Sequence, residues 1–219
     1  MNRESLELLR KCLAELDVEL TANEIGRFAA FGNELKKWNR KINLTAIRGD
    51  RDIVIKHFVD SLTLLGRIGK TGTMLDIGSG GGFPAIPIKI MCPQLSVVSV
   101  DAVEKKIFFQ RHAARELHFH GFTALHVRGE ELAKSHAGHF DWIVSRAFAD
   151  LSYFAFVAKP LLKNTGHIIA MKGKEGRAEA EACEKQLLEI GVRVTDCVHL
   201  KLPVTGDDRC LVIMVKQLE

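Results

Sequence analysis

Residues 75–87 read LDIGSGGGFPAIP, and the fold can be worked out from this stretch. A short apolar run leads into four glycines within five positions, and two prolines follow them. A loop that only reverses the chain needs a single glycine, because one residue at positive φ is enough for most tight turns. Four glycines between a strand and the start of a helix therefore predict a ligand that lies directly on the backbone.

Outward from this loop, short apolar runs alternate with helical stretches. We predict strands at 74–77, 95–100, 124–127, 142–144 and 167–171, and helices at 104–117, 151–162 and 176–189. Buried parallel strands joined by helical crossovers have this pattern. The runs at 193–200 and 209–216 have no helix between them, so we expect an antiparallel pair at the sheet edge. The prediction is an α/β fold with a doubly wound, mostly parallel sheet.

The first 70 residues have a helical pattern throughout. Apolar residues recur at spacings of three and four in 5–16 and in 21–42, which predicts two amphipathic helices. Asp50 can cap a third helix that runs to about residue 65. We therefore expect a helical cap at 1–70 and a Rossmann-like domain at 71–219, packed as one compact unit.

Composition narrows the class of protein. Of 219 residues, 47% are hydrophobic and 26% charged, which is enough for a sizeable core. Five scattered cysteines without a C-x-x-C motif argue against a disulfide scaffold and a zinc ribbon, and His136 and His139 lack a third metal ligand. These patterns predict a protein without a metal. Because no signal-like apolar segment is present, we also expect a cytoplasmic location. A net charge of +4 is compatible with a nucleic-acid partner.

The ligand of the glycine loop is open between two classes at this point. Segment 80–85 matches the G-x-G-x-x-A fingerprint of dinucleotide-binding proteins, so a nicotinamide-dependent oxidoreductase is one candidate. Two carboxylates favour another ligand. Asp76 precedes the glycines and can hold an ammonium group or order the loop, while Asp101 ends the second strand and can accept both hydroxyls of a ribose. An acid, a glycine loop and a distal acid together fit S-adenosylmethionine.

The chain also resembles a known family, the bacterial small-subunit ribosomal RNA guanine-N7 methyltransferases, also called the glucose-inhibited division protein B family. The blocks that carry the resemblance are WNRKINLTAI (38–47), HFVDSL (57–62), LDIGSGGGFPAIP (75–87), KKIFFQRHAARELH (105–118), FDWIVSRAFA (140–149) and AMKGK (170–174). Ala85 departs from the glycine that is usual in this family, and alanine is the accepted alternative where a helix packs closely. Segment 174–207 carries little of the family pattern.

This resemblance implies a class I methyltransferase fold, with S-adenosylmethionine as cofactor and guanine N7 in a loop of 16S ribosomal RNA as target. The family's cofactor contacts correspond to Gly78, Phe83, Gly129, Glu130 and Arg146. To these we add Asp76, Gly80 and Asp101 from their places around the loop.

The chemistry that the sequence lacks is consistent with N7 as the target. Methylation of an adenine amino group commonly uses an N-P-P-Y-like box, and no such box follows the fourth predicted strand. Methylation of a pyrimidine carbon needs a cysteine nucleophile, and Cys92 lies in a predicted turn away from the strand ends. Guanine N7 carries no proton, so its methylation needs positioning and no general base. We expect Arg146 and Lys172, at two strand ends, to do this positioning. The guanidinium of Arg146 would face an RNA phosphate, guanine O6 or the cofactor carboxylate, and a plain salt bridge is the alternative.

Basic residues of the cap provide candidates for RNA binding. These candidates are Lys36, Lys37, Arg40, Lys41, Asn43 and His57. Trp38 falls on the apolar stripe of its helix and is expected in the core. His57, Asp60 and Ser61 share one helix face, which favours a local hydrogen-bonded cluster over a nucleophilic triad. The expected partner is 16S RNA or the small subunit, bound by a monomer. An RNA-binding module without turnover and a small-molecule methyltransferase remain as alternatives.

Overall fold

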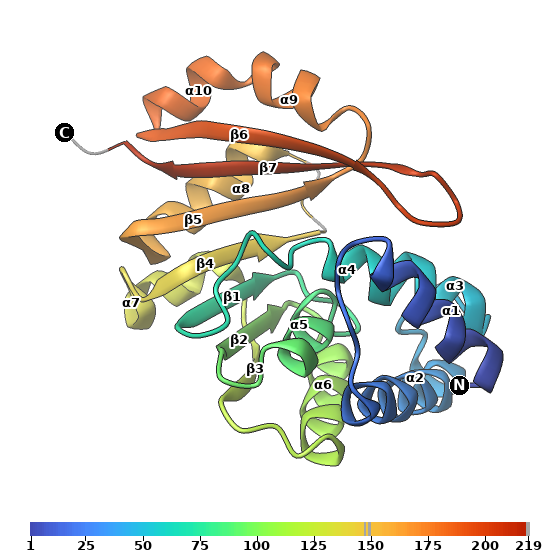
Figure 1. Cartoon of the computed structure of the whole chain (residues 1–219). Coiled ribbons are helices and arrows are strands. Elements are labelled where there is room, and N and C mark those ends of the chain that lie inside the picture. The colour runs from blue at the N-terminus through green and yellow to red at the C-terminus, as the bar shows by residue number, and fades with distance from the viewer. Residues whose placement is uncertain (147, 149, 218–219) are drawn as a thin grey trace.

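A seven-stranded mixed sheet forms the centre of the computed structural model, which describes residues 1–146, 148 and 150–217. The strand order is β3-β2-β1-β4-β5-β7-β6, with β7 antiparallel to both of its neighbours and the remaining pairs parallel (Figure 1). The strands are β1 Thr73–Ile77, β2 Ser96–Asp101, β3 Phe122–His126, β4 Phe140–Ser145, β5 Leu162–Lys172, β6 Val192–Lys201 and β7 Asp208–Lys216. The predicted parallel sheet with an antiparallel C-terminal edge is confirmed.

Helices form most of the first 62 residues and lie in every connection between consecutive strands except that between β6 and β7. The N-terminal group is α1 Arg3–Ala14, α2 Ala22–Ile42, α3 Asp50–Ile53, the π-helical segment η1 Val54–Val59 and α4 Asp60–Leu62. The connecting helices are α5 Ala85–Met91, α6 Glu104–Glu116, η2 Gly129–Leu132, α7 Ala133–His136, α8 Leu151–Ala158, η3 Lys159–Leu161, α9 Gly176–Ala182 and α10 Glu184–Glu189. A capping box between Thr21 and Glu24 starts the longest of them, α2.

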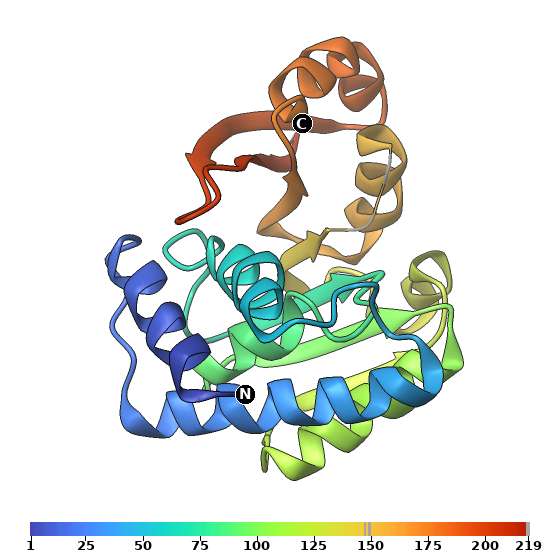
Figure 2. The ribbon, with the colours of Figure 1, turned by 90° about the vertical axis from the view of Figure 1, so that its right-hand side faces the viewer.

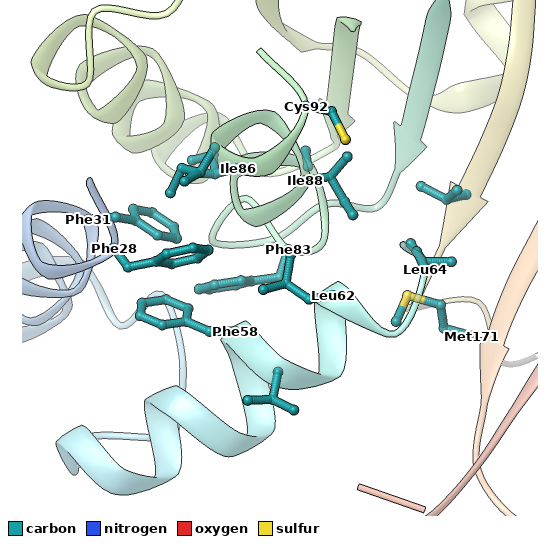
Figure 3. Packing of buried hydrophobic residues seen from close by; sticks show 14 of the residues in the cluster. Phe28, Phe31, Phe58, Leu62, Leu64, Phe83, Ile86, Ile88, Cys92 and Met171 are labelled. Carbon is teal, nitrogen blue, oxygen red and sulfur yellow. The ribbon is translucent and has the colours of Figure 1, made fainter. Parts of the chain in front are cut away.

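The N-terminal helices pack on the side of the sheet covered by α5 and α6. Helix α2 contacts both α5 and α6, and Figure 2 shows it running along that side of the molecule. Aromatic rings fill the boundary: Phe83, from the glycine loop, lies 5.3 Å from Phe31 of α2 and 6.3 Å from Phe58 of η1, between ring centroids (Figure 3). One continuous hydrophobic cluster therefore joins the cap to the sheet domain.

The third predicted helix differs from the expectation in its start and in its winding. Gly49 is its N-cap, and the carboxylate of Asp50 instead accepts from Asn2 N at 2.8 Å and pairs with Lys36. The helix then widens to π-helical winding over Val54–Val59, which inserts an extra residue into a turn. The segment packs against α1, and its Phe58 contacts Phe28 and Phe31 of α2, while the apolar periodicity gives no signal of the π-helical winding.

Two later helices are shorter than predicted. Helix α8 ends at Ala158, because Pro160 lacks an N–H for continued helical bonding and the chain passes through η3 into β5. The predicted helix 176–189 is interrupted at Cys183, where α9 ends and α10 begins.

Candidate functional site

The glycine loop joins β1 to α5 at the carboxyl edge of the parallel strands. Gly78, Gly80 and Gly82 have φ values of 75°, 58° and 88°, which only glycine adopts without strain. The backbone N–H groups of Gly78 and Ser79 both donate to Val100 O, at 2.9 and 3.1 Å, so the end of β2 anchors the loop. A Cβ placed on Gly80 would meet no described atom within 4 Å, so the loop is open at that point.

Asp76 lies at the end of β1 beneath this loop and is completely buried. Its Oδ2 accepts from Ala85 N at 3.0 Å, while Oδ1 is a buried polar oxygen without a partner among the described residues. Burial raises the pKa of this carboxyl to about 7, and the nearby charge of Arg146 opposes the rise. An unpaired buried carboxylate oxygen is costly, so this site fits a ligand that supplies an N–H donor or a positive charge.

Asp101 orders the glycine loop from the neighbouring strand. Its Oδ2 accepts from Gly80 N at 2.9 Å and its Oδ1 accepts from Val103 N at 2.8 Å, with Lys106 Nζ 3.6 Å away. The carboxylate is 7% exposed at the end of β2. Asp101 therefore lies beside the loop, as predicted, and its contact with a ribose stays a prediction.

Gln110 is a loop-organising residue that sequence reasoning missed. Its buried Nε2 donates to Ser79 Oγ at 2.8 Å and to Gly80 O at 2.9 Å, and its Oε1 accepts from Ser99 Oγ. The signal was present in the sequence, because Gln110 interrupts the buried stripe of α6 with an amide. A buried amide that satisfies both ends of its hydrogen bonding holds a loop firmly.

Phe83 and His57 stack where the loop meets the cap. Their ring centroids lie 4.2 Å apart with planes 12° from parallel, and Phe83 is 3% exposed. The side chain of Phe83 therefore belongs to the interface between cap and sheet. A cofactor contact at this residue would be made by main-chain atoms.

His57 does not lie on the exposed basic surface that we predicted for RNA. It is 6% exposed: its Nε2 lies 2.9 Å from Thr45 Oγ1 and its Nδ1 lies 3.3 Å from Arg146 Nη2. Because a guanidinium only donates, Nδ1 is the acceptor and Nε2 carries the proton. Burial, with the Arg146 charge, lowers the pKa of His57 to about 3, so the ring is neutral. It fills the space between Thr45 and Arg146 without adding a charge.

Arg146, just after β4, points toward the cap. Its Nη1 donates to Lys56 O at 3.1 Å and pairs with Asp60 Oδ2 at 3.4 Å, and its guanidinium carbon lies 5.4 Å from the Phe83 ring centroid. The ion pair that was the alternative for this residue is thus present. A contact with RNA or cofactor, through the exposed quarter of the side chain, stays a prediction.

Asp60 joins Arg146 to a second arginine from the other end of the chain. Arg209, at the start of β7, donates from Nε to Asp60 Oδ1 at 2.7 Å. Strand β7 is antiparallel and pairs Cys210 with Lys172, so its start meets the carboxyl edge of β5. The expected local cluster exists in part: Ser61 Oγ donates to His57 O at 2.6 Å, while Asp60 serves the two arginines.

Lys172, at the end of β5, is held by the segment that follows β4. Its Nζ donates to Phe148 O at 3.0 Å and to Glu179 Oε1 at 2.8 Å, and Glu179 also accepts from Leu151 N at 3.0 Å. The pair therefore links Phe148 to the start of α8. Direct participation of Lys172 in the reaction stays a prediction.

Gly129 and Glu130 begin η2, after β3. A Cβ on Gly129 would lie 2.9 Å from Val157 Cγ1 and 3.0 Å from Ile77 Cγ2, so no larger residue fits there. The exposed carboxylate of Glu130 accepts from the hydroxyl of Tyr153, and this hydrogen bond lowers the pKa of Glu130.

The predicted RNA-binding cations of the cap lie around the last turns of α2. Lys37 pairs with Glu34 at 3.2 Å, and Arg40, Lys41 and Asn43 are exposed. Trp38 packs on Phe109 as part of the core, as expected.

Two kinds of feature are absent from the residues that the structure describes. No group of three or more histidine, cysteine or acidic side chains gathers there in a way that could hold a metal ion. Within the same residues, no helix has the length and apolar character needed to cross a bilayer.

Comparison with solved structures places the fold. A SAM-dependent methyltransferase from Aquifex aeolicus superposes with a TM-score of 0.59 at 16% identity, covering 84% of this chain and 98% of that one. A putative S-adenosyl-L-methionine-dependent methyltransferase from Methanococcus maripaludis gives a TM-score of 0.59 at 16% identity, over 86% and 93% of the two chains. The strand order and these likenesses identify the class I methyltransferase fold.

Sequence comparison identifies the family. The chain is 57% identical over 216 residues to a ribosomal RNA small subunit methyltransferase G from Geotalea uraniireducens, covering 99% of both chains. It is 54% identical over 219 residues to the protein of the same name from Geobacter metallireducens, covering all of both chains. The family model described as rRNA small subunit methyltransferase G matches residues 24–209, and this chain belongs to that family.

Proposed function

We propose that this chain transfers a methyl group from S-adenosylmethionine to N7 of a guanine in a loop of 16S ribosomal RNA. The observation that carries the cofactor assignment is Asp76, whose buried Oδ1 has no partner among the described residues and lies beneath the glycine loop. The ammonium group of S-adenosylmethionine supplies the missing donors. Membership of the methyltransferase G family supports ribosomal RNA as the substrate.

The proposed cofactor contacts surround the loop. They are Asp76, Gly78, Gly80, Phe83, Asp101, Gly129, Glu130 and Arg146. Asp76 takes the ammonium group, Gly78 and Gly80 allow close approach of the backbone, and Asp101 holds the loop while it faces the ribose. Glu130, fixed by Tyr153, lies on the adenine side.

The residues around the site need only to orient the two reactants. Bound S-adenosylmethionine supplies a methyl group on a sulfonium, which the N7 lone pair takes as the electron pair of the carbon–sulfur bond stays on sulfur. No protein group has to remove a proton, because N7 carries none. Arg146 and Lys172 act as positioning residues: Arg146 holds the cap against Phe83, and Lys172 holds the chain after β4.

Several broader expectations stay predictions. These are the division into a cap of 1–70 and a domain of 71–219, the cytoplasmic location, the monomeric state and the absence of a metal. RNA contacts at Lys36, Lys37, Arg40, Lys41 and Asn43 are proposed on the outer face of α2. For His57 we replace an RNA contact with a structural role, because both ring nitrogens are engaged inside the protein.

Methyl transfer from labelled S-adenosylmethionine to unmodified small-subunit RNA, naked and assembled, tests the proposal. Borohydride–aniline treatment then cuts the RNA only where guanine carries an N7 methyl. We expect label and one cut in a loop. Label without a cut would reject N7 as the target. No label on any RNA form would reject the proposed enzyme and favour a dehydrogenase, which NADH fluorescence would test, or a binding module.

A further inference from the structure

A pocket of about 340 Å³ lies at the end of α2, outside the glycine-loop site. It is lined by Lys36, Asn39, Arg40, Asn43 and Arg48, and it is hereafter the basic pocket. Sequence reasoning did not single out Arg48. Among the residues that the structure describes, no acidic side chain lines the pocket, and none of the five lining residues is apolar.

The fold builds the pocket by turning the chain back along α2. Asn43 ends α2 in the left-handed conformation, with φ 49° and ψ 64°, and residues 44–49 then return beside the last turns. Asn39, which is 7% exposed, locks this return: its Nδ2 donates to Thr45 O and its Oδ1 accepts from Thr45 N, both at 2.9 Å. The wall of the pocket is therefore fixed before any ligand arrives.

The charges in the pocket are only partly compensated. Lys36 pairs with Asp50 behind the pocket. Arg40 and Arg48 are exposed, and neither has a hydrogen-bond or ion-pair partner among the residues that the structure describes. Two unpaired guanidinium groups beside two amides form an anion site, and a guanidinium binds phosphate oxygens in a bidentate manner.

We propose that the basic pocket seats a phosphodiester group of the RNA substrate, with Arg40 and Arg48 as its donors. This inference rests on the proposed function. The pocket is connected to the cofactor loop by direct contacts: Thr45, fixed by Asn39, binds His57 through Oγ1, and His57 stacks on Phe83. A backbone phosphate held here brings neighbouring nucleotides to the side of the molecule that carries the glycine loop.

The experiment measures RNA affinity against salt concentration for the wild type, Arg40→Gln and Arg48→Gln. Each lost phosphate contact reduces the slope of log K against log salt by about 0.7 for single-stranded RNA. We expect this reduction in both variants, with a higher KM for RNA and unchanged cofactor affinity. Arg10→Gln is the matched control, because it removes one exposed arginine from α1 of the same cap and should leave the slope unchanged.

A charge-conserving variant, competition by phosphate and methyl transfer by the wild type separate the pocket inference from the proposed function. Arg48→Lys should restore the salt slope, because it keeps the charge. Inorganic phosphate should weaken RNA binding by the wild type more than by Arg48→Gln; equal weakening would argue against a phosphate seat. If the wild type methylates RNA while both glutamine variants match Arg10→Gln, the pocket inference is wrong and the proposed function stands. If the wild type transfers no methyl group, the proposed function itself fails.

Discussion

At Gly80, a role in ligand binding can be tested separately from a role in stability. Its φ of 58° costs a non-glycine residue about 1 kcal/mol, yet no described atom lies within 4 Å of the space that a side chain would enter. We predict that Gly80→Ala lowers the free energy of unfolding by about 1 kcal/mol and weakens S-adenosylmethionine binding at least tenfold, by about 1.4 kcal/mol or more. Urea unfolding and calorimetric titration measure the two effects.

Gly138→Ala is the control for this substitution. Gly138 has φ 60° and the same open surroundings, but it lies in the turn between α7 and β4. It should show the same loss of stability with normal cofactor binding. Equal cofactor affinity in the two variants would show that the space above Gly80 is not used by the cofactor.

Arg146 is the second residue whose role can be separated from stability. It contacts Lys56 O, His57 and Asp60, while Asp60 keeps Arg209 when Arg146 is removed. We predict that Arg146→Ala stays folded and lowers kcat for methyl transfer at least a hundredfold, because positioning supplies most of the catalysis. Single-turnover transfer, with circular dichroism as the check on folding, measures this. Unchanged turnover would reject the positioning role.

At the scale of elements, sequence patterns predicted the helices and strands that depend on residues close together in the chain. Every strand of the sheet and the antiparallel hairpin could be predicted, because apolar runs and glycine punctuation act over a few residues. The π-helical winding of η1 could not, because nothing in the apolar periodicity distinguishes it from an ordinary helix. The break at Cys183 was also missed, because the composition of 176–189 is helical throughout.

The same contrast between neighbouring and distant residues holds within the site. Asp76, the glycines and Asp101 could be placed from the sequence, because they sit at the ends of predicted strands. The pairing of Asp60 with Arg209 could not, since 149 residues separate them and the antiparallel return of β7 alone brings them together. The burial of His57 could not be predicted either, because nothing in its local pattern shows that Phe83 stacks on it.

The bond between Asp60 and Arg209 ties the C-terminal hairpin to the cap. Asp60 is 4% exposed, and removing a partner from a buried carboxylate costs more than breaking a surface pair, because it leaves a buried charge less compensated. We predict that Arg209→Gln lowers the free energy of unfolding by about 1–3 kcal/mol in urea titrations. Lys201→Gln breaks an exposed pair with Asp208 on the same hairpin and should change it by less than about 0.5 kcal/mol. Similar losses in both variants would show that Asp60 does not couple the elements.

At the scale of the whole molecule, two buried groups have opposite effects on stability as the pH changes. The pKa of Asp76 is raised from 3.8 to about 7, so the folded state binds more protons than the unfolded state between these values. Its contribution to the free energy of unfolding therefore falls as pH rises. The pKa of His57 is lowered from 6.5 to about 3, so the unfolded state binds more protons and stability rises with pH. Between pH 5 and 6 the two contributions nearly cancel.

Removing one of the two titrating groups should therefore reveal the pH dependence that the other group contributes. We predict that the free energy of unfolding of the wild type is nearly constant between pH 5 and 6. For Asp76→Asn, in which the amide oxygen can still accept from Ala85 N, it should rise by about 1 kcal/mol per pH unit, and for His57→Gln it should fall by a similar amount. Urea unfolding at several pH values measures these slopes, and each slope is independent of the baseline stability of its variant. Parallel profiles in all three proteins would mean that neither the Asp76 carboxyl nor the His57 imidazole is held out of its ordinary titration range.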